Sequence, residues 1–494
     1  MADKRADAWK LGAGWNETFE WYAKAILELQ SREITDRTSW RYLAAMHGFR
    51  PDWWIGYGLI DDTTPLPSDD EQEAAWNQCQ HGGYYFLPWH RGYLARFEAI
   101  VAAAVEKVGG PPGWKLPYWN YLDATNPDAR RIPDAFLEEF MPDGVTANPL
   151  SNLPRFGQTV LGPEPGFGID DITLDAMAEP DFSGSVSFGG PETSGFDHWG
   201  IGNGALESNP HGAVHVLVGG APPVNPGLGY MSRFETAGLD PIFWLHHCNL
   251  DRLWEAWLGK AGVHPETGQA WLDGPFAPDK PFLLPTLDGT GLKPFTSRET
   301  LRGGSLYVPY DDLTAGTGVT PAPGAAAVAI RQGPATMANP KLIGANDRQL
   351  ELGDAPAATV VRIAAAEHGG VATAMGPGEA AVAAGRLYLR LENIRGADVA
   401  GGIAAYLNPP SATELPDANK AGGAALFGLG AASDVDGGHG GNGISLTFDI
   451  TDLARRLAAE GNFDPEHLDV KVKATHSGGD DKPVTVERVT VLRG

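Results

Sequence analysis

The sequence predicts two regions of different fold class: a mainly α-helical region over residues 1–313 and an all-β region over residues 340–494. In the first region, apolar residues recur at the spacing of amphipathic helices. In the second, short segments alternate apolar and polar residues, as half-buried strands do. We therefore expect a helical domain with long loops, a linker over 314–339, and a β-sandwich of about seven strands.

Helix-starting and helix-ending residues place the helices of the first region. Pro88 is a natural helix start and Gly109-Gly110 a natural stop, so an amphipathic helix is expected between them, with His90 in its first turn. Two more helices are expected earlier in the chain, and a third follows much later: Trp15–Gln30, Thr38–Phe49 and Asp240–Gly259. Residues 126–209 are rich in Pro, Gly and Asp and predict a long irregular segment.

The all-β region has a regular pattern of short strands. Period-two alternation predicts strands at Arg386–Ile394, Ile444–Ile450, Leu468–Ala474 and Val484–Leu492. A helical insert is expected at Asp452–Ala459. The segment Gly422–Gly443 is rich in glycine and predicts a mobile loop.

Composition excludes several classes of partner. The formal net charge of −25 over 494 residues argues against general attraction to nucleic acid or anionic lipid. There is no apolar run of 18 residues and no apolar segment of a secretory signal, so we expect no membrane span and a cytoplasmic protein. The two cysteines allow at most one disulfide, which suits a reducing compartment. A homo-oligomer is compatible with the sequence.

Six of the 13 histidines form two sets of three, His47/His81/His90 and His211/His215/His247. In each set, two histidines are close in the sequence and the third lies far from them. A single histidine in an apolar segment is more often a hydrogen-bonded core residue than a ligand. Two sets of three change that balance, because three imidazoles around an ion leave coordination positions open for chemistry. Imidazole ligands disfavour magnesium, calcium and manganese, so zinc and copper remain. Two sets imply two ions.

Three segments around these histidines resemble the tyrosinase and polyphenol oxidase family. They read HGGYYFLPWHRGYLARFE, ESNPHGAVHVLVGG and DPIFWLHHCNLDRLW. The resemblance implies a four-helix bundle around a type 3 dinuclear copper centre that binds dioxygen. Copper A would be held by the first histidine set and copper B by the second. In the HH pair, His247 would be the ligand, since it lies four residues before Asp251, and His246 a neighbour that lines the pocket.

The resemblance also assigns roles to three residues near these histidines. Cys79 lies two residues before His81, the spacing at which fungal members form a thioether between the cysteine sulfur and the histidine ring. Glu207 occupies the position of a glutamate that holds a water near the coppers and helps to take a phenol proton. Phe234 matches an aromatic gate over copper A. The alternatives are a free buried thiol, a solvated glutamate and ordinary core packing. Cys248 is expected to be a reduced packing residue.

The region after residue 300 resembles the C-terminal region of the plant enzymes, from YVPYDDL to VTVERVTVL. There a β-sandwich packs over the copper site and keeps the enzyme latent. The resemblance thus implies a dicopper catalytic domain over 1–313 and a shielding domain over 340–494. Leu426 and Phe427 are our candidates for the side chain that caps the copper site.

We therefore expect an enzyme that oxidises o-diphenols to o-quinones with dioxygen, using two copper ions and small phenolic substrates. Members that hydroxylate monophenols efficiently often carry an asparagine just after the first copper B histidine. Gly212 stands there instead, so we expect weaker monophenol activity. The alternatives are an o-aminophenol oxidase, a hemocyanin-like oxygen carrier and, least favoured, a zinc hydrolase.

Overall fold

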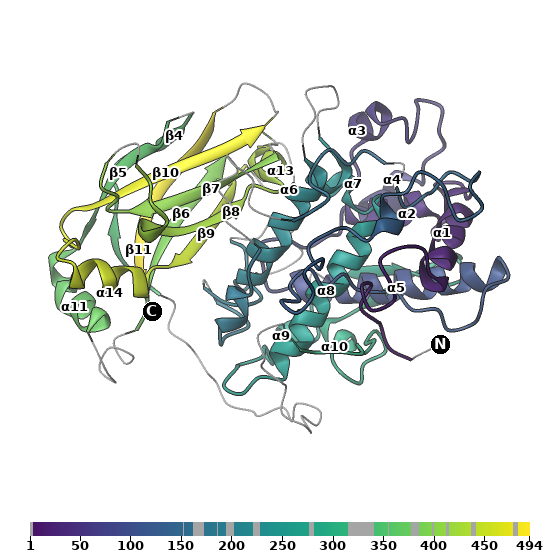
Figure 1. Cartoon of the computed structure of the whole chain (residues 1–494), viewed down its shortest axis with the longest axis horizontal. Coiled ribbons are helices and arrows are strands. Elements are labelled where there is room, and N and C mark those ends of the chain that lie inside the picture. Colours follow the sequence, from purple (N-terminus) through teal and green to yellow (C-terminus); the bar gives the residue numbers. More distant parts are fainter. Residues whose placement is uncertain are drawn as a thin grey trace.

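The structure is a computed structural model. It describes residues 3–494 apart from 152, 162–171, 185, 194–201, 221–227, 276–280, 315–339, 354, 377–384, 398–399, 412–413, 436–440 and 478–482. All but the first residue of the predicted linker 314–339 therefore lies outside the described residues. Two regions of different class lie side by side in Figure 1, a helical one in purple to teal and an all-β one in green to yellow. This agrees with the two predicted fold classes.

Four longer helices form the centre of the helical region: α1 (Glu17–Gln30), α2 (Trp40–His47), α5 (Phe86–Lys107) and α8 (Pro241–Leu258). Their starts follow from capping, since the side chains of Asn16, Ser39 and Asp240 accept hydrogen bonds from the first turns of α1, α2 and α8. Helix α5 begins two residues before Pro88, which its first turn tolerates because the N–H that proline lacks has no partner there. Helices α1 and α8 both pack against α5.

Short elements complete the helical region. The helices are α3 (Pro51–Gly56), α4 (Asp69–Ala75), α6 (Ala213–Gly219), α7 (Phe234–Ala237), α9 (Gln269–Leu272) and α10 (Ser297–Thr300), and a hairpin joins β1 (Phe282–Pro285) to β2 (Leu292–Phe295). Single helical turns lie at η1 (Asp134–Phe136), η2 (Asp175–Ala178), η3 (Glu207–Gly212) and η4 (Tyr230–Ser232). Most of the described part of 126–209 is irregular, as predicted.

Buried charges connect α5 and α8 with both ends of the helical region. Asp251 of α8 pairs with Arg91 of α5 and with Arg5, whose guanidinium Nε is 2.8 Å from Glu98. Tyr310 lies in the YVPYDDL segment, and its hydroxyl contacts both Arg5 and Asp251. Since these groups are almost fully buried, removing one charge would leave its partner uncompensated. The pairs therefore fix α8, which carries two of the histidines, relative to α5.

The second region is all-β, as predicted. Its strands are β3 (Lys341–Ala345), β4 (Leu350–Leu352), β5 (Ala357–Ile363), β6 (Leu387–Arg395), β7 (Ala400–Leu407), β8 (Lys420–Ala425), β9 (Ile444–Asp449), β10 (Leu468–Ser477) and β11 (Val484–Arg493). Helices α11 (His368–Met375), α13 (Leu429–Ser433) and α14 (Thr451–Ala459) and turns η5 (Ala365–Glu367) and η6 (Asp417–Asn419) lie between them. The helical insert expected at Asp452–Ala459 is α14.

The predicted sandwich of separate sheets is not confirmed. The strands form one antiparallel path in the order β8-β7-β10-β5-β3-β11-β6-β9, with β4 beside β11. Strand β5 joins the two halves, because Ala357–Val361 pair with β10 and Arg362 and Ile363 pair with β3. The sheet is strongly curved, so β8 and β9 at its two ends come close to each other.

The prediction of a mobile loop at Gly422–Gly443 is wrong for Gly422–Ala425 and Leu429–Ser433, which form regular structure. Gly422 lies within strand β8, and helix α13 follows. Glycine replaces larger strand residues here because a Cβ at Gly422 would lie only 2.2 Å from the Phe448 ring. The pattern of alternating side chains that would have revealed the strand is therefore missing from the sequence.

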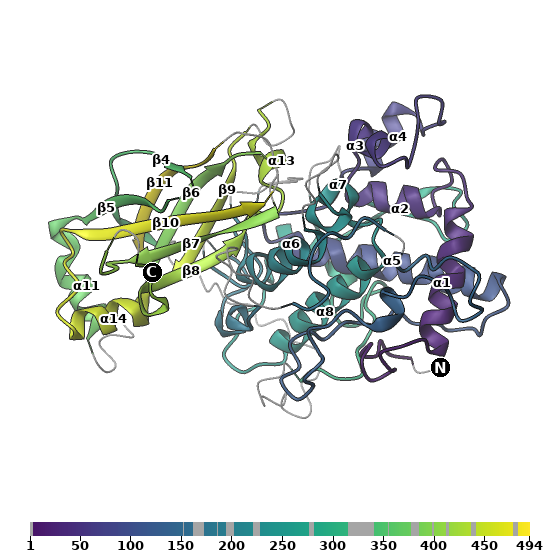
Figure 2. The ribbon, with the colours of Figure 1, turned by 45° about the horizontal axis from the view of Figure 1, so that its top comes forward.

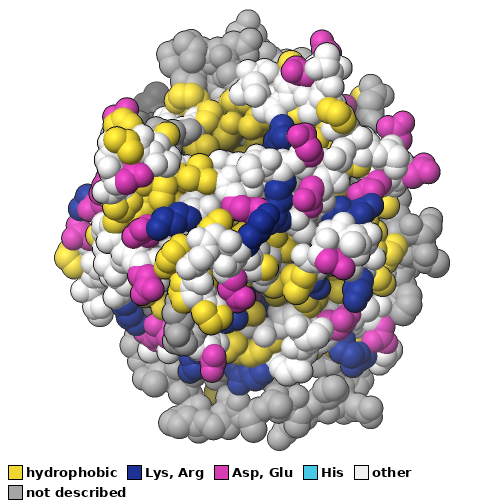
Figure 3. All heavy atoms as spheres, turned by 90° about the vertical axis from the view of Figure 1, so that its right-hand side faces the viewer, with side chains coloured by type: hydrophobic (Ala, Val, Ile, Leu, Met, Phe, Trp, Pro, Cys, Tyr) yellow, Lys and Arg dark blue, Asp and Glu magenta, His cyan; other side chains and the backbone are white. Residues whose placement is uncertain are grey.

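Strand β8 faces the helical region, where it contacts turn η3 and helix α6, in agreement with both ribbon views (Figures 1 and 2). The far end of the helical region, in Figure 3, carries acidic and basic side chains intermixed with apolar ones, and no continuous basic surface among the described residues. None of the described helices is both long and apolar enough to cross a membrane.

Candidate metal centre

Seven histidines and one cysteine gather in two buried clusters within the helical region. His47 ends α2, His90 lies in α5, and Cys79 and His81 belong to the loop that precedes α5. The other cluster contains His211 of η3, His215 of α6 and both His246 and His247 of α8. Within each cluster the candidate ligand atoms lie within 4.8 Å of one another. The structure thus brings together all six histidines that the sequence singled out.

Backbone carbonyls orient four of these rings. The Nδ1–H groups of His47 and His90 donate to the carbonyls of Phe234 and Phe86, both at 2.7 Å. His211 and His215 donate in the same way, to the carbonyls of Glu207 at 3.1 Å and of Met231 at 2.8 Å. Because a carbonyl can only accept, the proton of each ring lies on Nδ1 and the lone pair on Nε2. Such outer hydrogen bonds are typical of metal-binding histidines.

The second cluster has the charge state that a metal ion requires. Burial lowers the pKa of His215 to about 3 and the pKa values of His211 and His247 well below their ordinary range, so these rings are neutral. The Nε2 atoms of His215 and His247 are 3.2 Å apart, and Nε2 of His211 has no hydrogen-bond partner among the described residues. Buried nitrogen lone pairs that converge in this way fit a cation that prefers imidazole, such as zinc or copper.

The two clusters face each other. The rings of His90 and His247 are stacked with centroids 4.4 Å apart, and those of His81 and His211 are 5.6 Å apart. Phe243 lies between the clusters, at 4.8 Å from the His47 ring and 4.2 Å from the His247 ring. This arrangement suits a pair of ions at one site rather than two separate metal sites.

His246 is a fourth histidine in the second cluster. Its Nδ1 lies 3.0 Å from the hydroxyl of Tyr121, and its ring is parallel to that of His211 at 5.8 Å. The sequence predicted a neighbour of the metal site at this position. It did not reveal Tyr121, because the two residues are separated by 125 positions and no motif connects them.

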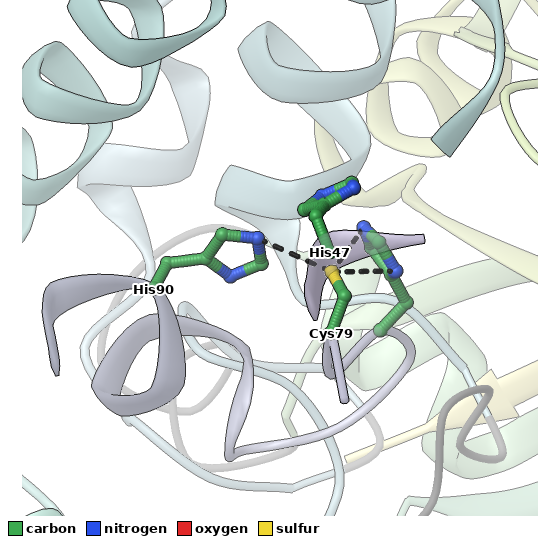
Figure 4. Close-up of side chains that lie close together, drawn as sticks. His47, Cys79 and His90 are labelled. Carbon is green, nitrogen blue, oxygen red and sulfur yellow. Dashed lines mark hydrogen bonds between the residues drawn. The ribbon is translucent and has the colours of Figure 1, made fainter. Parts of the chain in front are cut away.

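Cys79 lies among the histidines of the first cluster. Its sulfur is 3.4 Å from Nδ1 and 3.7 Å from Nε2 of His81, and 3.4 Å from Nε2 of His90 (Figure 4). The side chain is fully buried, and burial raises the pKa of the thiol. The sulfur is therefore placed beside the His81 ring, where the family resemblance implies a covalent link. Cys248 is also a free buried cysteine.

Glu207 approaches the metal centre from turn η3. The backbone N–H of Gly82 donates to both of its carboxylate oxygens, at 2.9 and 3.1 Å, and the N–H of Gly204 also donates to the carboxylate. Burial nevertheless raises the pKa of Glu207 to about 8, and two nearby cations would act in the opposite direction. A cavity of about 10 Å³ adjoins this side chain and is lined by His81, Asn203, Glu207, Ser208, His211, Gly212, Ala425 and Phe427.

Three other candidates lie around the histidines. Phe234 contributes its carbonyl to His47, and its ring is 6.1 Å from that of His81. Gly212 adjoins the all-β region, where a Cβ would lie 3.6 Å from Ala425 and 3.7 Å from the Cβ of Phe427. The Phe427 ring stacks on His215 at 4.1 Å, whereas Leu426 is fully buried and does not line this cavity. Of the two predicted capping residues, Phe427 is the one that contacts the histidines.

Comparisons with known proteins agree with this geometry. A family model described as the common central domain of tyrosinase matches residues 37–260, and one described as a domain of unknown function (DUF7868) matches residues 339–494. Tyrosinase HcTyr1 of Hahella sp. (strain CCB-MM4) is 32% identical over 495 residues, which covers 96% of this chain and 97% of that protein. Chloroplastic catechol oxidase B of Solanum tuberosum is 32% identical over 211 residues, covering 40% of this chain and 34% of that protein.

Solved structures share the fold over nearly the whole chain. Latent apple tyrosinase superimposes with a TM-score of 0.62 at 20% identity and covers 99% of this chain and 97% of its own. Tyrosinase from Burkholderia thailandensis gives a TM-score of 0.51 at 16% identity and covers 96% of this chain and 94% of its own. With two histidine clusters that fit a dinuclear copper centre and a full-length tyrosinase relative, the chain belongs to the tyrosinase and polyphenol oxidase family of type 3 copper oxidoreductases.

Proposed function

We propose that this copper phenol oxidase prefers o-diphenols, which it converts to o-quinones, and hydroxylates monophenols more weakly. One observation carries the preference. At position 212, beside Glu207 and the first histidine of the second cluster, there is no side chain that could hydrogen-bond a water molecule. Removing the proton of a monophenol is the step that hydroxylation adds, and a phenol holds its proton with a pKa of about 10.

In this proposal His47, His81 and His90 hold copper A, and His211, His215 and His247 hold copper B. The copper ions supply the binding of dioxygen and accept electrons from the phenol. The chain supplies the orientation: carbonyls of Phe234, Phe86, Glu207 and Met231 keep four Nε2 lone pairs directed inward. Ring positions fixed in this way reduce the reorganisation needed during the reaction.

Glu207 is proposed as the acceptor of the phenol proton, through a water in the adjoining cavity. The phenol O–H bond breaks, the water takes that proton and passes one of its own to the carboxylate. Two backbone N–H groups, of Gly82 and Gly204, hold the carboxylate in place. A base positioned in this way contributes about 10²- to 10⁴-fold to proton transfer.

Residues 340–494 are proposed to keep the enzyme latent, with 1–313 as the catalytic domain and 314–339 as the linker. The support is the position of Phe427, whose ring packs on His215 and lies 5.6 Å from His211. A substrate ring cannot occupy the same space. Phe427 must therefore move, or be removed with its domain, before a bulky phenol reaches the copper ions.

Oxygen uptake by the copper-loaded full chain tests the function. We expect turnover of catechol at a higher kcat/KM than that of the corresponding monophenol. Equal kcat/KM values would contradict the preference. Faster turnover of an o-aminophenol than of catechol would point to an o-aminophenol oxidase, and reversible oxygen binding without turnover would point to a carrier.

A further inference from the structure

One residue with a side-chain amide, Asn203, is among the described residues that line the cavity beside Glu207. Its volume of about 10 Å³ is room for a single water molecule, and a buried water is held by two to four polar groups. Gly212, Ala425 and Phe427 offer no polar side-chain atom on their part of the wall. Apart from the histidines and Glu207, the described lining residues with polar side chains are Asn203 and Ser208.

The backbone around Asn203 is anchored to the carboxylate that the water would serve. The next residue, Gly204, donates its N–H to Glu207, and Ala205 donates its N–H to the carbonyl of Ser187 at 2.8 Å. A Cβ at Gly204 would lie 2.6 Å from the backbone of Gly189, so this turn packs too closely for any other residue. Asn203 is thereby held next to Glu207 although it lies outside the helical turn that carries the glutamate.

The Asn203 side chain is available for a water. The structure gives it no hydrogen bond to any other residue that it describes. Ser208 is the weaker candidate because of its place in a helical turn, where its backbone N–H donates to the carbonyl of Gly204 at 2.9 Å. In that geometry a serine hydroxyl readily bonds back to the carbonyl four residues earlier.

We propose that Asn203 is a positioning residue, which together with Glu207 orients the water that takes the proton of a monophenol. The water donates one hydrogen to the Glu207 carboxylate and the other to Oδ1 of Asn203. Both hydrogens then point away from the substrate, and an oxygen lone pair faces the phenol O–H group. The proposal rests on the proposed phenol oxidase function, and it makes Asn203 the determinant of monophenol hydroxylation in this chain.

The test compares Asn203→Ala with the wild type, both as copper-loaded full chains. We expect kcat for a monophenol to fall about threefold to tenfold, as for one lost hydrogen bond, while kcat for catechol changes less than about twofold. Ser208→Ala is the matched variant from the same cavity, and it should leave the ratio of the two activities unchanged. A crystal structure of each variant should show the water beside Glu207 in the wild type and Ser208→Ala, and not in Asn203→Ala.

Rescue separates positioning from a structural role. In Asn203→Ala/Gly212→Asn an amide returns to the cavity from another lining position, where a Cβ fits at 3.6 to 3.7 Å from its neighbours, so monophenol activity should recover. Equal loss of catechol and monophenol turnover in Asn203→Ala, or loss in Ser208→Ala alone, would overturn the proposal. If the wild type oxidises neither phenol, the proposed function fails instead, whereas the crystallographic water still tests Asn203.

Discussion

The ring of Phe427 lies flat on the ring of His215, with centroids 4.1 Å apart and planes inclined by 18°. Phe427 comes from the all-β region, and His215 comes from the helical region, 212 positions earlier in the chain (427 − 215). In the proposed latent state, this ring over a histidine of the metal centre occupies the space that a phenol would need. Under that proposal, access to the copper ions depends on how the two regions are held together.

Shortening Phe427 should open the copper site. In Phe427→Ala we expect kcat/KM for a bulky phenol to rise about fivefold. The substrate no longer has to displace a stacked aromatic pair, which is worth about 1 kcal/mol. Steady-state kinetics with a small and a bulky catechol measure the effect. The matched control is Arg386→Ala, which breaks a contact between the regions, an ion pair with Glu179 at 3.6 Å, away from the histidines. This pair, whose arginine is nearly half-exposed, is worth at most about 1 kcal/mol. Equal kinetics for Phe427→Ala and the wild type would contradict the proposal that Phe427 blocks the copper site.

The sulfur of Cys79 should become bonded to His81. It is almost equally far from both ring nitrogens, so we expect the bond at Cε1, the carbon between them. Forming it removes two hydrogens, and copper with dioxygen is the oxidant. Mass spectrometry of the peptide after copper loading should therefore show a mass about 2 Da lower, with Cys248 still open to alkylation after unfolding. A fully active enzyme in which both cysteines are alkylated would contradict this prediction.

Acid should destabilise the copper-free protein. Burial lowers the pKa of His215 to about 3, below the 6.5 of the unfolded chain. As the pH falls below 6.5, the unfolded state therefore binds a proton that the folded state does not, and stability is lost until the pH approaches 3. The free energy of unfolding should fall by about 1.4 kcal/mol per pH unit for each such histidine. Urea unfolding between pH 7 and 4 measures this change. The free energy of unfolding should depend less steeply on pH in His215→Gln than in the wild type. A wild-type free energy of unfolding that does not change with pH would contradict the prediction.

Asparagine at position 212 should favour monophenols. Its Cβ would meet Ala425, Phe427 and the carbonyl of Glu207 at ordinary contact distances of 3.6 to 3.7 Å, so we expect the variant to fold. An amide there adds a partner for the water beside Glu207. The ratio of monophenol to catechol kcat should rise about threefold or more, the effect of one hydrogen bond. Gly212→Ala is the control that adds volume without an amide, and an equal rise in that variant would contradict the explanation.

Local patterns predicted three of the helices that carry the histidines, α2, α5 and α8, and long-range contacts determine much of the rest. Asn16 and Asp240 mark helix starts because capping acts within one turn, and the alternation in β6 and β11 reflects burial on one face. Gly422 helped to conceal strand β8, because the ring of Phe448 on another strand leaves no room for a side chain there. Asn203, Tyr121 and the choice of Phe427 over Leu426 likewise follow from contacts between distant segments, which no spacing in the sequence records.

The copper content of single-histidine variants tests the central assignment most directly. We predict two copper ions per wild-type chain, a loss of copper and of phenol oxidation in His90→Ala and His247→Ala, and retention of both ions in His246→Ala. His264→Ala is the control, because that side chain is more than half exposed and pairs with Asp181 outside both clusters. Metal analysis of the purified variants gives the answer. Two copper ions and full activity in His90→Ala and His247→Ala would contradict the dinuclear centre assigned to these two clusters.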